Sequence, residues 1–244
     1  MRFKKALGIL RTKIRLLLMI GVLLAAAAGC QFAGEYLHSH YIREEASETS
    51  GNISEKKTVV IDSGHGGKDP GKVGINGAQE KELNLQIAEK LKKYLEEHQI
   101  TVVMTRTKDE RLADSQVEDL KARVELIDKE SPALAVCIHQ NSYQSPEVKG
   151  AQVFYYKHSA EGKKLAQILQ KSLKENLDTE NKRQEKEDST YYMLLHTGAP
   201  TVIAECGFLS NPQEAALLNT AEYRQKVAEA LCKGILEYFT STGK

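Results

Sequence analysis

The sequence lacks an excess of charge of either sign. Its 244 residues include 34 lysines and arginines and 33 aspartates and glutamates, which leaves a net charge of only +1. Proteins that attract nucleic acid or acidic lipid through their overall field carry a large basic excess. The composition therefore excludes that kind of binding for the molecule as a whole. No nucleic-acid partner is expected, and any partner must be inferred from a local site.

Cysteines and the common nucleotide and nucleophile motifs are also scarce. Cys30 lies in an N-terminal leader, while Cys137, Cys206 and Cys232 lie beyond it at spacings that fit no cysteine-rich zinc motif. We interpret these three as packed thiols, with a disulfide between Cys137 and Cys206 as the alternative. There is no Walker or dinucleotide-binding fingerprint, no nucleophile elbow and no internal repeat. These absences disfavour a nucleotide-dependent enzyme and a serine hydrolase.

The N-terminus has the pattern of an export signal. Several basic residues precede an unbroken apolar run from Leu16 to Ala28. The run is short for a membrane span but approaches the required length when residues 29–34 are added, and Ala27–Cys30 resembles a lipoprotein processing site. Cleavage, lipidation and retention as an anchor all stay open. We expect a cell-envelope protein on the extracytoplasmic side of the membrane, either attached through this N-terminal segment or secreted.

Composition divides the chain into three segments. Residues 1–34 are predicted to be the export signal or membrane anchor. Residues 35–57 are polar, without a sustained apolar period, and are predicted to be a flexible tether. Residues 58–240 are predicted to be the catalytic domain, because a length of about 190 residues suits one sizeable domain better than two.

The predicted domain alternates strands with helices. Short apolar runs predict strands at Thr58–Asp62, Thr101–Thr105, Leu134–Ile138, Ala151–Tyr155 and Thr201–Ala204. Helical patterns occur at Glu80–Gln99, Gln116–Lys129, Ala160–Leu177 and Ala221–Tyr238, with a shorter one after Asn211. The charged segment Asp178–Thr190 is predicted to be a solvated loop. Continuous apolar runs suit strands buried on both faces, so we expect an α/β fold: a single three-layer domain whose mostly parallel or mixed central sheet is flanked by helices.

Polar side chains directly follow three of these strands. His65 comes after the first strand, His139 after the third and Glu205 after the fifth. In open α/β sheets ligands bind outside the carboxyl ends of the strands, so we expect the three side chains to converge there. Taken singly, each histidine could be a structural residue, and Glu205 could be a buried ion-pair partner of Arg123 or Arg106.

Glu80 is the fourth candidate. At about 100° per residue it shares a helix face with Leu83 and Ile87, whereas Glu82 and Glu89 point the opposite way. A carboxylate on an apolar face is costly unless it is paired or bound to a metal. A helix cap or a partner for the helix dipole is the alternative explanation.

Two imidazoles and one carboxylate are the ligands of many hydrolytic zinc sites, which keep a fourth position for water. His65, Glu80 and His139 make up such a set. A second carboxylate is then needed to move a proton from the water to the leaving group, and Glu205 fits that role. We therefore predict a Zn²⁺ cofactor, although the same ligands accept other divalent ions.

Five blocks of sequence occur in a recognisable order between about Thr58 and Phe239. They are Val60–Gly67, Glu80–Leu85, Thr105–Asp109, Ile138–Ser142 and Glu205–Asn211. Together they resemble the zinc-dependent N-acetylmuramoyl-L-alanine amidases of the Amidase_3 type. The resemblance implies a zinc-exopeptidase-like fold, zinc on His65, Glu80 and His139, and Glu205 as the catalytic acid and base. Ser63 stands where the family usually has proline, which leaves the ligands unchanged.

The resemblance also implies the substrate. Members of this family hydrolyse the amide bond between N-acetylmuramic acid and L-alanine in peptidoglycan. The short tethered chain and the stretch Tyr191–Leu194 look most like the germination-specific amidases of spore-forming bacteria, which implies spore cortex maturation through muramic-δ-lactam. Because no wall-targeting module is evident, an activating protein partner is also considered. The alternatives are a zinc exopeptidase on the same scaffold and a non-catalytic, membrane-tethered peptidoglycan-binding protein.

Overall fold

A computed structural model describes residues 57–243, so the predicted export segment and all but the last residue of the tether lie outside the described part. The strands are β1 (Thr58–Ser63), β2 (Thr101–Met104), β3 (Leu134–Asn141), β4 (Gln152–Tyr156), β5 (Lys186–Asp188) and β6 (Thr201–Phe208). The helices are α2 (Glu80–Glu97), α3 (Gln116–Glu130), α4 (Ala160–Leu177), α5 (Tyr192–His196), α6 (Pro212–Leu218) and α7 (Ala221–Thr242). Within this described range, none of the helices combines the length and apolarity needed to cross a bilayer.

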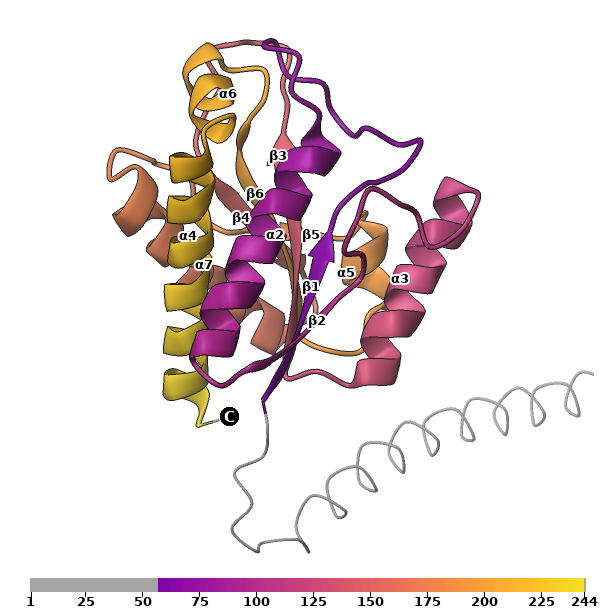
Figure 1. Cartoon of the computed structure of the whole chain (residues 1–244). Helices are drawn as coiled ribbons and strands as arrows, with labels where there is room; N and C mark the ends of the chain where they lie inside the picture. The colour runs from indigo at the N-terminus through magenta and orange to yellow at the C-terminus, as the bar shows by residue number, and fades with distance from the viewer. Residues whose placement is uncertain (1–56, 244) are drawn as a thin grey trace, which may run out of the picture. The chain divides into compact units, whose positions relative to one another are not determined.

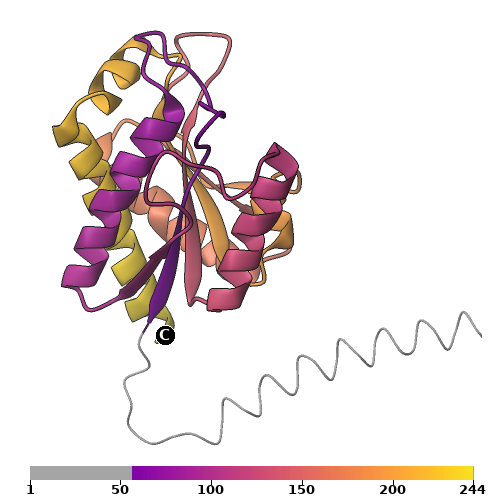
Figure 2. The same cartoon turned by 45° about the vertical axis from the view of Figure 1, so that its right-hand side comes forward.

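The strands form one six-stranded mixed sheet in the order β2-β1-β3-β6-β4-β5 (Figure 1). The four strands β2, β1, β3 and β6 are parallel, β4 runs antiparallel to β6, and β5 is parallel to β4. Helices cover both faces of the sheet, which makes three layers (Figures 1 and 2). The predicted α/β fold class is therefore confirmed.

Alternating side chains of the central strands build two apolar cores. In β1, Val59 and Ile61 join the core under α2, α4 and α7, whereas Val60 joins the core under α3 and α5. Every residue of β6 is buried. Strands enclosed on both faces need apolar side chains in both directions, which is why these runs are continuously apolar rather than alternating.

The strand order creates a topological switch point between β1 and β3. The chain passes from β1 through α2 to β2 on one side, and then through α3 to β3 on the other side of β1. At such a point the loops leaving the carboxyl ends of adjacent strands diverge and leave a crevice for a ligand. The Gly64 amide still bonds to the carbonyl oxygen of Ile138 at 3.1 Å, so the crevice begins directly after this pair.

The structure differs from the sequence-based expectation mainly in its short elements. The segment predicted to be a solvated loop contains β5, whose three residues are held by backbone pairing with β4 at the edge of the sheet. The helix α5 was also not predicted. β6 continues past Ala204 to Phe208, and α7 extends to Thr242. Backbone pairing can thus place charged residues such as Lys186 and Glu187 in a strand that no apolar pattern marks.

Candidate metal centre

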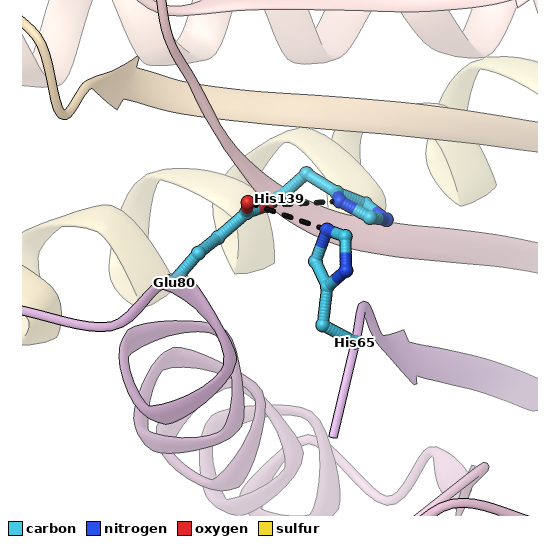
Figure 3. Close-up of side chains that lie close together, drawn as sticks. All are labelled: His65, Glu80 and His139. Carbon is cyan, nitrogen blue, oxygen red and sulfur yellow. Dashed lines mark hydrogen bonds and ion pairs between the residues drawn. The ribbon is translucent and has the colours of Figure 1, made fainter. Parts of the chain in front are cut away.

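Three side chains converge in the crevice between β1 and β3. His65 lies two residues after β1, Glu80 is the first residue of α2, and His139 belongs to β3. His65 Nε2 is 3.2 Å from Glu80 Oε2, and His139 Nδ1 is 3.0 Å from Glu80 Oε1. Figure 3 shows the Glu80 carboxylate directed at both imidazoles. One potential ligand atom from each residue lies within 4.8 Å of the others, so the three could bind a single ion.

The spacing and chemistry of this cluster fit zinc. Ligands on a tetrahedral zinc ion stand roughly 3.3 Å apart, given typical zinc–nitrogen and zinc–oxygen bond lengths. The two carboxylate–imidazole distances of 3.2 and 3.0 Å are close to that value. The donor set of two imidazoles and one carboxylate is also one that catalytic zinc sites use.

The electrostatics of the cluster favour a positive charge at its centre. Glu80 is only 2% exposed. Burial alone raises the pKa of Glu80, but hydrogen bonds from His139 and His65 hold it far below its usual range. Burial lowers the pKa of His65, but its hydrogen bond to Glu80 and the charge of Glu80 outweigh burial and raise this pKa to about 9. An ionised carboxylate thus stabilises positive charge on the two imidazoles, and a metal ion bound there would replace their protons.

The Glu80 carboxylate is held in place by groups outside the backbone of its own helix. Its Oε2 accepts a hydrogen bond from the Lys72 amide at 2.8 Å, and its Oε1 accepts one from the Gln140 amide at 3.0 Å. Asn84, one turn along α2, donates from its side chain at 3.4 Å. Gln79, at the N-cap position of α2, makes no side-chain cap. The Glu80 carboxylate therefore contacts the side chains of the cluster and does not cap the N-terminus of α2.

A second carboxylate fixes the orientation of His65. Nδ1 of His65 lies 2.9 Å from Asp69 Oδ2, and the other Asp69 oxygen accepts the Gly71 amide at 3.0 Å. His65 has a left-handed backbone with φ 64°, an uncommon conformation for a residue with a Cβ. With Nδ1 bonded to Asp69, only Nε2 remains for a cation, as in carboxylate–histidine–zinc arrangements. Asp69 was not among the predicted site residues. Its position four residues after His65, in a glycine-rich turn, could have indicated a partner for this histidine.

Two buried arginines brace the turn that carries His65. Arg123 donates to the carbonyl oxygens of Ser63 and His65, at 2.8 Å each. Arg106 donates to the carbonyl oxygens of Ser63 at 2.9 Å and Gly64 at 3.1 Å. These bonds satisfy the carbonyl groups that a sharp turn leaves without strand partners.

The ion-pair partners of Arg123 are Asp62 and Asp119, each at 2.8 Å. Burial raises the pKa of Asp62, but the Arg123 charge and the Thr105 hydroxyl outweigh burial and leave it below its usual value. The alternative that Glu205 pairs with Arg123 or Arg106 is therefore wrong. Within residues 57–243, Glu205 takes part in no ion pair with an arginine or lysine.

Glu205 lies on β6 directly beside His139 on β3, as the strand register pairs the two residues. It is 6% exposed, and its Oε2 has no hydrogen-bond partner among the described residues. Burial is the main cause that raises the pKa of Glu205 to about 7; the charge of His139 opposes the rise and that of Glu80 adds to it. A carboxyl group that titrates near neutral pH can both accept and donate a proton.

The remaining histidines of the described residues lie outside the cluster. His98 bonds to the Tyr94 carbonyl oxygen, His158 packs against Tyr156, and His196 packs against Tyr192 with ring centroids 4.2 Å apart. None of these three histidines belongs to the metal cluster. Cys137, Cys206 and Cys232 are buried free thiols, as predicted, so the disulfide alternative is wrong.

Comparison with known proteins identifies the family of the chain. The family model described as N-acetylmuramoyl-L-alanine amidase matches residues 59–237. The germination-specific N-acetylmuramoyl-L-alanine amidase of Bacillus subtilis is 40% identical over 195 residues, which cover 77% of this chain and 81% of the relative. The probable cell wall amidase LytH of Staphylococcus epidermidis is 29% identical, over 79% of this chain and 62% of LytH.

Solved structures show the same fold. The CwlD amidase of Clostridioides difficile, determined in complex with the GerS lipoprotein, matches with a TM-score of 0.74 and 35% identity, over 76% of this chain and 99% of CwlD. The catalytic domain of CwlV, an amidase of Bacillus (Paenibacillus) polymyxa, matches with a TM-score of 0.65 and 30% identity, over 75% of this chain and 98% of that domain.

Proposed function

Because the chain belongs to the N-acetylmuramoyl-L-alanine amidase family, we propose that it is a zinc-dependent enzyme that releases stem peptides from peptidoglycan. The bond cleaved is the amide between N-acetylmuramic acid and L-alanine. Membership of the family makes the chain an amidase, and it disfavours the exopeptidase and the non-catalytic binder that the sequence left open.

The observation that carries the zinc proposal is the convergence of His65, Glu80 and His139 on one point in the crevice. These three residues would hold the ion. Zinc, when bound, supplies a Lewis acid for the amide carbonyl and lowers the pKa of a water molecule. The protein contributes the geometry, since Asp69 fixes the His65 imidazole and two backbone amides fix the Glu80 carboxylate.

Glu205 is proposed as the proton-transfer residue. Its carboxylate accepts a proton from the attacking water as the new C–O bond forms, and then donates this proton to the L-alanine nitrogen as the C–N bond breaks. Its unpartnered buried oxygen and its position beside His139 support the assignment. Glu205 then returns to the ionised form, and the products are a free lactyl carboxylate and a free peptide amine.

The biological setting is proposed from the relatives. The Bacillus subtilis relative is germination-specific, which supports a role in spore cortex maturation in which stripped muramic acid forms the δ-lactam. The CwlD structure contains a lipoprotein, which supports an activating protein partner for this chain. The cell wall relatives support an extracytoplasmic location, with residues 1–34 as the export signal or membrane attachment.

The decisive experiment incubates the protein with purified peptidoglycan, with and without zinc, and identifies released fragments by mass spectrometry. We expect free stem peptides that begin with L-alanine, and their loss on chelation. Glu205→Gln should slow release by about 10²–10⁴-fold while zinc content stays unchanged. Glu187→Gln changes an exposed glutamate on β5 and serves as the matched control. Undiminished release by Glu205→Gln would refute its role, and cleavage of free peptides alone would indicate an exopeptidase.

A further inference from the structure

Three of the most exposed large apolar side chains of residues 57–243 lie in two loops that are anchored to the same segment of the chain. Val73 is 61% exposed, Ile75 60% and Tyr143 61%, more than any other large apolar side chain in the described part of the chain. Val73 and Ile75 lie in the loop before α2, and Tyr143 lies in the loop after β3. We call these three side chains the apolar rim. Clustered exposed apolar groups mark binding surfaces more often than single ones do.

Backbone hydrogen bonds bring the two loops together. The first loop is a small hairpin in which Val73 bridges to Gln79, and the Ile75 amide bonds to the Leu209 carbonyl oxygen at 3.1 Å. The Tyr143 amide bonds to the Ser210 hydroxyl at 2.9 Å. Ile75 and Tyr143 are thus attached to consecutive residues of the segment that follows β6. The apolar rim is therefore contributed by two separate loops whose anchoring points are adjacent.

The apolar rim borders the metal cluster on the side of Glu80. The Lys72 amide, next to Val73, donates to one oxygen of Glu80. The Gln140 amide, three residues before Tyr143, donates to the other. The same carboxylate thus bonds to both chain segments that lead into the rim.

A second border of the cluster is charged. Near His65, the loop after β2 carries Lys108, Asp109, Glu110 and Arg111. Arg111 Nη2 lies 3.8 Å from Asp69 Oδ2, and the Gly67 amide bonds to Asp109 at 2.7 Å. The surroundings of the metal cluster therefore include one apolar border and one charged border. A substrate with chemically different halves would have a preferred orientation between them.

We propose that the apolar rim binds sugar rings of the glycan strand next to the muramic acid whose amide is cut. This inference rests on the proposed function and extends it to the surroundings of the scissile bond. Sugar rings present apolar C–H faces that pack on an aromatic ring such as Tyr143, with aliphatic contacts from Val73 and Ile75. The stem peptide carries carboxylates and suits the charged border with Arg111. The glycan would then lie over the apolar rim.

The test uses glycan strands from which all stem peptides have been removed, so that binding does not depend on catalysis. The full chain is titrated with these strands, and bound protein is measured by co-sedimentation. Tyr143→Ala should weaken binding about fivefold or more, the effect of roughly 1 kcal/mol of lost stacking. Tyr143→Phe keeps the ring and should retain most of the affinity. Val117→Ala removes a side chain that is 58% exposed on α3, outside the rim, and controls for loss of apolar surface.

A second measurement compares two cleavable substrates, intact peptidoglycan strands and a muramoyl peptide with a single sugar. Tyr143→Ala should raise KM for both substrates unequally. The fold-increase for the strands should be at least five times the fold-increase for the single-sugar substrate. Unchanged glycan binding by Tyr143→Ala, as expected if the rim instead docks a protein partner, would overturn the proposal. So would an equal change of KM for both substrates. Absence of cleavage by the unaltered protein would count against the proposed function and leave the glycan-binding result standing.

Discussion

The imidazole of His65 has only one nitrogen to offer a cation, because Asp69 holds the other at 2.9 Å. We predict that Asp69→Asn lowers zinc affinity about 10–100-fold, since an outer carboxylate both orients a histidine ligand and increases its basicity. Competition with a chromophoric chelator measures this affinity. Asp109→Asn is the control, because Asp109 bonds to Gly67 in the same turn without touching His65. Equal zinc affinities for the two variants would contradict the role given to Asp69.

Gly64 packs against the other histidine of the cluster. A Cβ at this position would overlap the Cε1 and Nε2 atoms of the His139 ring. We predict that Gly64→Ala displaces the imidazole and weakens zinc binding at least tenfold, with little protein left metal-loaded at equimolar zinc. Gly77→Ala is the comparison: Gly77 has φ +81°, but a Cβ added there would meet no atom within 4 Å, so strain without overlap should leave zinc affinity unchanged. Equal losses in both variants would show that overlap with His139 is not responsible.

Individual residues of the site differ in how well the sequence predicts them. The burial of Glu80 follows from helical periodicity and is confirmed, with Glu82 and Glu89 exposed on the opposite face. The bracing by Arg106 and Arg123 could not be predicted, because it joins residues that are distant in sequence through tertiary contacts alone. Periodicity reports which face of an element is buried, but not which polar groups meet there. The roles of His65, Glu80, His139 and Glu205 stay predictions.

At the scale of elements, the long strands and helices were predictable and the short ones were not. The predicted helix Ala160–Leu177 agrees with α4 at both ends, because eighteen residues give the apolar period room to repeat. β5 has three residues, and α5 has five, too few for any period to be detected. β6 was cut short in the prediction because Glu205 interrupts its apolar run, although the strand continues to Phe208.

The packing of α4 against α7 depends on a glycine. A Cβ at Gly234 would lie 2.6 Å from Leu169 Cδ2 and 3.3 Å from Leu169 Cα. We predict that Gly234→Ala lowers the free energy of unfolding by about 1–2 kcal/mol, because overpacking outweighs the better helix propensity of alanine. Urea denaturation measures the change.

A double-mutant cycle identifies the cause of that change. Leu169→Ala alone should cost about 2–5 kcal/mol through loss of buried apolar contacts. In the Gly234→Ala background, Leu169→Ala should lower the free energy of unfolding by at least about 1 kcal/mol less than it does alone, because the smaller side chain relieves the overlap. Additive effects would mean that overlap with the Leu169 side chain is not the cause of the loss in Gly234→Ala.

At the scale of the whole molecule, acid stability depends on the buried pair of Asp62 and Arg123. The folded pKa of Asp62 lies below the ordinary value of 3.8, so its contribution is complete above that pH and is lost as the pH falls through the folded pKa. We predict that Asp62→Asn lowers the free energy of unfolding by about 3 kcal/mol at pH 7, where Arg123 loses a buried partner. Below pH 3.8 the difference from the unaltered protein should shrink. Urea denaturation from about pH 7 to pH 2, with chelator present, tests this, and a constant difference would exclude the linkage.

The place of the site follows from the architecture alone. Alternating strands and helices imply a parallel sheet, and such sheets bind ligands at the carboxyl ends of the strands. The strand order, which locates the switch point between β1 and β3, was not predictable because the sequence does not reveal on which side of β1 each later strand is added. The convergence of His65 and His139 was predicted, but the pairing of β1 with β3 that brings it about required the fold.

The hairpin with Ile75 and the loop with Tyr143 are attached to the segment after β6 through their backbone amides, which leaves both side chains outside the attachment. Substitutions at these two positions can accumulate without releasing the loops. The strands beneath them hold Glu205 and His139 among fully buried neighbours, where few substitutions are tolerated. Natural variation and laboratory evolution should therefore change which polymer the protein binds before they change which bond it cuts.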